Sequence, residues 1–200
     1  GQFLIIRGGQ GEEARYITIN PKLTGRLQLA APTEKRRAKT HVVLTLSNGL
    51  ELRYVDQKQM GQVYVSRVAP EVAGIPGFAE LGPEPLAMSE AEFRQRLRKF
   101  QGEIKGILIR NDFVAGIGNA YADEILWAAQ LHPYRKRPSL NDGEIGALYQ
   151  AMQQTLVAAT ANVRQEIGDE THREPRSFLN VHLQADKPCP RCGNPISEVK

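Results

Sequence analysis

Short runs rich in hydrophobic residues dominate the first third of the chain. They are rich in β-branched and aromatic residues and predict five strands, at residues 3–7, 16–20, 41–46, 50–55 and 62–66. Asn48 and Gly49 separate two of these runs, and an Asn-Gly pair suits the positive backbone φ of a tight hairpin turn. No helical pattern interrupts the runs, so they predict an antiparallel sandwich or barrel.

The pattern changes after residues 69–88, a segment rich in proline and glycine that predicts a linker. Apolar residues then recur at helical spacing in four stretches, at residues 89–100, 104–112, 120–130 and 141–163. The first and the last open with capping boxes, in which Ser89 or Asn141 accepts from a backbone amide and Glu92 or Glu144 reaches back. The predicted fold class is therefore α+β, with a β-sandwich followed by a helical domain.

Composition sets only broad limits on function. Hydrophobic residues make up 41% and charged residues 24% of the chain, as in ordinary globular proteins. A net charge of +4 and a sequence pI near 9.1 favour an anionic partner without identifying it. No apolar run approaches the ~20 residues of a membrane span, and no signal peptide is apparent, so a cytoplasmic location is expected. The chain starts at Gly1 rather than Met, so its natural start is expected to lie outside this sequence.

The strongest chemical signal lies in residues 105–126. Gly116 and Gly118 permit a tight turn between two helices. Asn119 then stands at the start of the next helix, where free amides and the positive end of the helix dipole favour a phosphate. Lys105, one helix earlier, is placed to meet the same phosphate. On spacing alone, an N-cap after a glycine turn with a solvated Lys105 is the simpler interpretation.

Residues 105–126 resemble, almost residue for residue, the helix–two-turn–helix element of the formamidopyrimidine-DNA glycosylase and endonuclease VIII family. The Leu-Gly-Pro-Glu-Pro-Leu stretch at 81–86 and the Leu-His-Pro stretch at 131–133 are similar to the segments that flank this element in the family. The resemblance implies that Asn119 and Lys105 grip the phosphates beside a damaged nucleotide. It implies a DNA-binding element that includes Lys105, Gly116, Gly118 and Asn119.

The two cysteines, Cys189 and Cys192, lie in a Cys-Pro-Arg-Cys arrangement. They are too few for a disulfide framework and leave a redox pair or half of a tetrahedral metal site. Residues 176–182 and 187–193 resemble the approach to the family's zinc-finger hairpin and its first half. The resemblance implies one structural zinc ion held by both cysteines, with a second Cys pair beyond Lys200. The nearby His182 is interpreted as a surface histidine rather than a third ligand.

The N-terminal sheet resembles the family less closely. Leu23 lies where the family has a Met that fills the gap left by an extruded base, and Met60 replaces an aromatic wedge. Such wedges partly restore the stacking that base flipping disrupts, which costs a few kcal/mol. Lys39 takes a phosphate-contacting position and Lys58 replaces an Arg. The alternative that Leu23 and Met60 are ordinary turn or core residues stays open.

The resemblance also predicts how the chain is divided. The expected parts are a sandwich of the catalytic domain at residues 1–68, a linker at 69–88, the helix–two-turn–helix domain at 89–165, and the first half of a zinc finger at 174–200. Compared with the family, the chain is expected to be truncated at both ends.

The resemblance implies a base-excision repair glycosylase with abasic-site lyase activity. Such an enzyme flips a damaged base, forms a Schiff base through an N-terminal proline amine, releases the base and nicks the strand by β-elimination. No catalytic residue is identified in this chain, and Gln2 stands where the family has a lysine near the damage. The expected partner is double-stranded DNA with damaged bases or abasic sites, bound by a monomer in the bacterial cytoplasm and nucleoid.

A second hypothesis is a non-catalytic paralogue that recognises abasic or distorted DNA without cleaving it. The departures from the family at Gln2, Leu23, Lys58 and Met60 motivate it. The first hypothesis requires an amine nucleophile in the complete protein, whereas the second does not.

Overall fold

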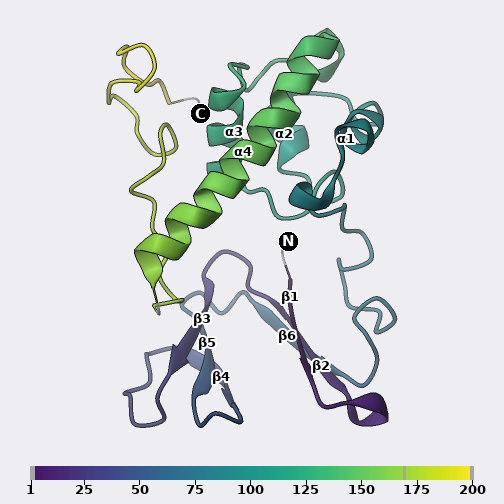
Figure 1. The fold of residues 1–200 in the computed structure, drawn as a ribbon, viewed down its shortest axis with the longest axis vertical. Helices are drawn as coiled ribbons and strands as arrows, with labels where there is room; N and C mark the ends of the chain where they lie inside the picture. The colour runs from purple at the N-terminus through teal and green to yellow at the C-terminus, as the bar shows by residue number, and fades with distance from the viewer. Residues whose placement is uncertain (1–2, 169, 199–200) are drawn as a thin grey trace. The chain divides into compact units, whose positions relative to one another are not determined.

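The computed structural model describes residues 3–168 and 170–198 of the chain. The chain forms two compact units, which are described separately. Unit 1 comprises Gly1–Glu80 and Arg164–Pro175, and unit 2 comprises Leu81–Val163 and Arg176–Lys200. Unit 1 contains the strands, and unit 2 contains most of the helical residues and the C-terminal segment (Figure 1). The boundary after Glu80 lies inside the predicted linker, whereas the assignment of residues 164–175 to unit 1 has no counterpart in the sequence pattern.

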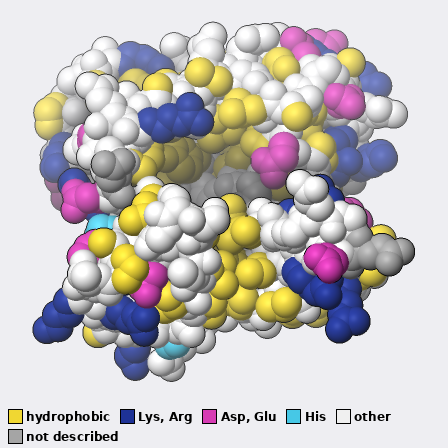
Figure 2. All heavy atoms as spheres, turned by 60° about the horizontal axis from the view of Figure 1, so that its bottom comes forward, with side chains coloured by type: hydrophobic (Ala, Val, Ile, Leu, Met, Phe, Trp, Pro, Cys, Tyr) yellow, Lys and Arg dark blue, Asp and Glu magenta, His cyan; other side chains and the backbone are white. Residues whose placement is uncertain are grey.

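Unit 1 holds two antiparallel sheets of three strands each. The first sheet has the order β1 (Leu4–Gly8), β2 (Arg15–Asn20), β6 (Gln62–Ser66). The second has the order β3 (Gly25–Ala30), β5 (Glu51–Asp56), β4 (Thr40–Thr45). Figure 2 shows hydrophobic side chains gathered on the face that it brings forward, with Lys and Arg toward the outer edges.

The Asn48-Gly49 turn forms as predicted between β4 and β5. The amide of Leu46 donates to the carbonyl of Leu50 at 2.8 Å, and the Leu50 amide donates to Asn48 Oδ1 at 3.1 Å. Strand β3 was not predicted, because its stretch Gly-Arg-Leu-Gln-Leu-Ala is short and contains no β-branched or aromatic residue. It forms because all six of its residues pair with β5, which lies more than twenty residues away in the sequence. The loop that carries Leu23 is correspondingly shorter than the sequence indicates.

Unit 2 is built on four helices. They are α1 (Glu90–Leu97), α2 (Ile104–Leu108), α3 (Asn119–Ala128) and α4 (Asp142–Ile167), whose last four residues belong to unit 1. Both predicted capping boxes are present, with Ser89 and Glu92 before α1 and Asn141 and Glu144 before α4. Helix α4 runs four residues beyond its predicted end, since Arg, Gln and Glu are good helix formers that continue a helix without an apolar stripe. None of the described helices has the length and hydrophobicity needed to cross a bilayer.

The core of unit 2 lies beneath the turn between α2 and α3. Phe113 is fully buried, and its ring meets Phe93 at a centroid distance of 5.4 Å and Phe100 at 5.2 Å. Helix α4 closes this core with Leu148 and Met152, both fully buried. The predicted fold class, α+β with antiparallel strands followed by a helical domain, is confirmed.

Candidate nucleic-acid interface

One side of the turn between α2 and α3 packs into the core of unit 2, and the other side is exposed to solvent. Phe113, Val114 and Ile117 are buried in the core, whereas Gly118 is exposed. Gly116 has a φ of 81°, a left-handed conformation that a side chain would strain, and its amide donates to Asn111 Oδ1 at 3.4 Å. The buried residues therefore fix the turn while its glycine backbone stays available to a ligand.

Asn119 is the first residue of α3, one position before the helix start predicted at residue 120. The N-cap position is Gly118, which has no side chain to satisfy the first amides of the helix. Among the described residues, none hydrogen-bonds to the side chain of Asn119, which is exposed. The alternative in which Asn119 is merely the N-cap is therefore not what the structure shows, and an anion approaching this helix start would meet free donors.

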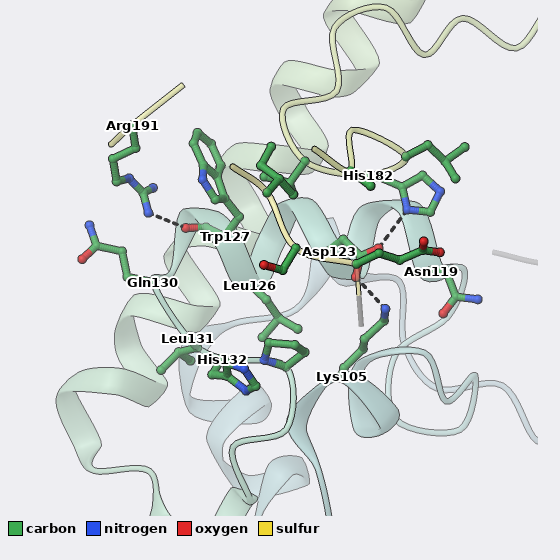
Figure 3. Close-up of a pocket in the computed structure, with 17 residues that line it drawn as sticks. Lys105, Asn119, Asp123, Leu126, Trp127, Gln130, Leu131, His132, His182 and Arg191 are labelled. Atoms are coloured by element: carbon green, nitrogen blue, oxygen red, sulfur yellow. Dashed lines mark hydrogen bonds and ion pairs between the residues drawn. The ribbon is translucent and has the colours of Figure 1, made fainter. Parts of the chain in front are cut away.

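Lys105 is not simply solvated. Its Nζ lies 2.7 Å from Asp123 Oδ1, and the side chain keeps 31% of its surface exposed. Asp123 also meets His182, whose Nδ1 lies 2.8 Å from Asp123 Oδ2. Figure 3 shows this chain of contacts, with Asn119 beside it at the start of α3. One carboxylate thus orients two nitrogen-bearing side chains next to the open helix start.

Glu124 is the residue that sequence reasoning missed. Its side chain is buried, with 3% of the residue exposed, and it accepts four hydrogen bonds from the segment that precedes the cysteines. The donors are the backbone amides of Asn180, Val181 and His182 at 2.8–3.0 Å and the Asn180 side-chain amide at 3.0 Å. A signal existed, because the helical period places Glu124 with Tyr121 and Ala128, which pack against the core.

A pocket of about 830 Å³ lies beside α3. Lys105, Asn119 and Asp123 line one part of it, and Trp127 and Arg191 line another. The pocket therefore joins the predicted phosphate-binding residues to the hairpin that carries the cysteines.

Cys189 and Cys192 lie on a tight hairpin in which Pro188 pairs with Pro195. The Gly193 amide donates to the Cys189 carbonyl at 2.8 Å. Hydrogen bonds from the Trp127 indole and then from the backbone amides of Arg191 and Cys192 lower the pKa of the Cys189 thiol to about 7. A sulfur surrounded by N–H donors is suited to the thiolate form, which is the form that binds metals. Across residues 3–168 and 170–198, no three or more His, Cys, Asp or Glu side chains are grouped so that they could hold a metal ion.

In unit 1, Asp56 ties together the loops that carry the predicted wedge residues. The residue is 1% exposed, and its carboxylate accepts from the Thr24 hydroxyl, from the Gly61 amide at 2.7 Å and from the Lys58 amide at 3.3 Å. Gly61 has no space for a side chain, since an added Cβ would collide with the Tyr54 hydroxyl. These contacts hold the loop before β3 against the loop after β5.

The side chains at the tips of these loops point outward. Leu23 is 69% exposed and Met60 is 47% exposed, so neither is a core residue. Lys58 is also exposed. Lys39 is exposed with a φ of 62°, and its carbonyl accepts from the Asp56 amide at 3.0 Å. Gln2 lies outside the described residues.

The predicted DNA-binding residues thus form two groups. Leu23, Lys39, Lys58 and Met60 gather around Asp56 in unit 1. Lys105, Gly116, Gly118 and Asn119 gather at the α2–α3 turn in unit 2.

Several sequence relatives of this chain are formamidopyrimidine-DNA glycosylases. Residues 81–170 match the H2TH domain of formamidopyrimidine-DNA glycosylase. The formamidopyrimidine-DNA glycosylase of Moorella thermoacetica is 37% identical over 191 residues, which cover 92% of this chain and 69% of that protein. That of Pelotomaculum thermopropionicum is 35% identical over 207 residues, covering 100% of this chain and 74% of that protein.

Solved structures with the same fold include complexes with DNA. A complex of MutM with DNA containing carbocyclic 8-oxo-G superposes with a TM-score of 0.82 at 28% identity, over 100% of this chain and 74% of that chain. A complex of Lactococcus lactis Fpg with DNA containing an abasic site superposes with a TM-score of 0.80 at 26% identity, over 99% and 77% of the two chains. By both sequence and fold, the chain belongs to the formamidopyrimidine-DNA glycosylase family.

Proposed function

We propose that this chain is part of a base-excision repair glycosylase, which removes damaged bases from duplex DNA and cleaves the abasic site that results. Its family consists of DNA glycosylases, and the two solved relatives hold damaged or abasic-site DNA. The observation that carries the proposal for this chain is the uncapped start of α3, where exposed Asn119 stands beside Lys105. The DNA substrate implies a location in the bacterial cytoplasm and nucleoid.

In this proposal the α2–α3 turn holds the DNA backbone. The Asn119 side chain and the backbone at the start of α3 donate to one phosphate. Lys105 has three N–H donors and uses one on Asp123, so the others remain for the same or the next phosphate. His182, on the other oxygen of Asp123, lies close enough to extend this surface.

The loops tied by Asp56 would act on the base. Exposed Leu23 and Met60 are suited to enter the gap left by a flipped nucleotide, because an apolar side chain restores part of the lost stacking. Lys39 and Lys58 would neutralise nearby phosphates.

We further propose that Cys189 and Cys192 bind one structural zinc ion. Zinc needs four ligands in such a site, so a second pair of donors, which the family resemblance places beyond Lys200, would complete it. The ion would supply no chemistry to base removal. It would hold the hairpin against α3.

The decisive experiment for the enzyme is borohydride trapping of the full-length natural protein on duplexes with an abasic site or an oxidised purine. Borohydride reduces an imine to a stable amine, so a glycosylase and lyase that acts through its N-terminal amine yields a covalent protein–DNA adduct. An undamaged duplex is the control. Tight, damage-specific binding without any adduct would instead establish the non-catalytic paralogue.

Replacing Asn119 with Ala is expected to weaken binding to an abasic duplex by about 1 kcal/mol or more, which is at least about fivefold in Kd. The reason is the loss of a phosphate contact at the helix start, and the salt dependence should not change because the amide is neutral. Titration by fluorescence anisotropy at two salt concentrations measures both. Gln154→Ala, at an exposed amide on α4, is the control. Equal affinity of the Asn119 variant and the wild type would refute the phosphate role.

A further inference from the structure

Trp127, on α3, contacts the cysteine hairpin through its indole N–H. It is the single tryptophan of the chain, and its indole Nε1 lies 3.5 Å from the sulfur of Cys189, within hydrogen-bonding distance for sulfur. The indole is half-buried, so its N–H is partly shielded from competing water. Because an indole N–H only donates, the sulfur is the acceptor.

Arg191 holds this tryptophan from the hairpin side. Its guanidinium lies over the Trp127 ring, 4.3 Å from the ring centroid, and its Nη1 donates to the Trp127 carbonyl at 2.8 Å. Figure 3 shows Arg191 reaching back to the end of α3 in this way. Arg191 stands between the two cysteines in the sequence, so stacking and hydrogen bonding fix the Cys-Pro-Arg-Cys turn relative to the helix.

We propose that Trp127 is a positioning residue for the zinc ligand Cys189: its indole N–H donates to the thiolate, and the Arg191 stack holds the indole in that orientation. This inference rests on the proposed zinc site. Groups that hydrogen-bond to metal ligands orient them and tune the metal bond, and their loss commonly weakens metal binding 10- to 100-fold. The same helix begins at Asn119, so this contact connects the metal hairpin to the element that carries the proposed phosphate site.

Trp127→Phe distinguishes the contribution of the indole hydrogen bond from that of the aromatic ring. Trp127→Phe keeps an aromatic ring in contact with the hairpin and removes only the donor and part of the stacking surface. In the full-length protein we expect it to lower zinc affinity about tenfold, measured by competition with a chromophoric chelator. With Co²⁺ in place of zinc, the sulfur-to-cobalt charge-transfer absorption should shift, because the thiolate has lost a hydrogen bond.

Tyr149→Phe is the matched control. It also removes one aromatic donor from unit 2, since the Tyr149 hydroxyl donates to the Met88 carbonyl at 2.9 Å, away from the hairpin. It should leave zinc affinity and the cobalt spectrum unchanged.

Three results would overturn the inference. Wild-type zinc affinity and cobalt absorption in Trp127→Phe would remove the role of the N–H while leaving the zinc proposal intact. Equal loss of zinc in both variants would reduce the effect to general destabilisation. Wild-type protein with far less than one equivalent of zinc would remove the zinc proposal and this inference with it.

Discussion

Replacing Glu124 with Ala is expected to destabilise unit 2 by about 3 kcal/mol and to release residues 180–182 from α3. The buried carboxylate accepts four hydrogen bonds, and its removal leaves three backbone amides without their acceptor. Hydrogen bonds to a charged acceptor contribute about 1.5–3 kcal/mol each, but water reaches the vacated donors near the surface and limits the total. Urea unfolding followed by Trp127 fluorescence measures the loss, and hydrogen exchange at residues 180–182 locates it.

The comparison variant for Glu124 is Asp142→Ala, which removes another carboxylate of the same unit. The Asp142 side chain is 94% exposed and makes only a long ion pair with Arg94, at 3.5 Å. Asp142→Ala should lower the free energy of unfolding by less than about 1 kcal/mol. If the Glu124 variant falls in the same range, and its amides exchange as slowly as in the wild type, then Glu124 does not anchor this segment.

The second large effect is expected at Asp56, where Asp56→Ala should destabilise unit 1 by about 2–3 kcal/mol. The carboxylate holds the loop before β3 through the Thr24 hydroxyl and the loop after β5 through the Gly61 and Lys58 amides. Without it the loops separate, and Leu23 and Met60 lose their fixed positions. Chemical unfolding followed by circular dichroism, with Glu71→Ala as the exposed-carboxylate control in the same unit, measures the change.

Asp56 also predicts a pH dependence. Burial raises the pKa of this carboxyl, but hydrogen bonds from Thr24 and from the Gly61, Lys58 and Met60 amides outweigh burial, so the pKa lies below its ordinary 3.8. A lowered pKa in the folded state means that the unfolded chain takes up the proton first as the pH falls.

The stability that Asp56 contributes is therefore complete at neutral pH, declines below about pH 4, and is lost once the folded protein is protonated as well. Unfolding curves of the wild type and of Asp56→Asn should differ most at neutral pH and converge in acid. A difference that stays constant from pH 7 to pH 3 would contradict this assignment.

Local signals in the sequence were sufficient for much of the fold. The capping boxes at Ser89 and Asn141 and the Asn48-Gly49 turn formed as predicted, because each depends on residues within a few positions of one another. Strand β3 was missed because it depends on β5 rather than on its own composition. The end of α4 was placed too early because an apolar stripe marks where a helix packs, not where it stops.

The candidate site divides in the same way. Asn119 was recognised because a glycine turn followed by a helix start is a local pattern that resembles the family's DNA-binding element. Lys105 was recognised as a cation, but its pairing with Asp123 was not, since it depends on how α2 packs against α3. The helical period placed Glu124 on the core-facing side of α3, but its partners could not be predicted, because its donors lie more than fifty residues further along the chain.

The sequence by itself determined the fold class, the family resemblance, the turn that presents Asn119 and the two cysteines suited to a metal. Each of these features depends on the residue types and spacing within a short stretch of the chain. Only the tertiary structure decided which polar groups Asp56, Glu124 and Trp127 would meet. A buried carboxylate or indole N–H needs a partner, but the identity of that partner depends on which distant segments the apolar cores bring together.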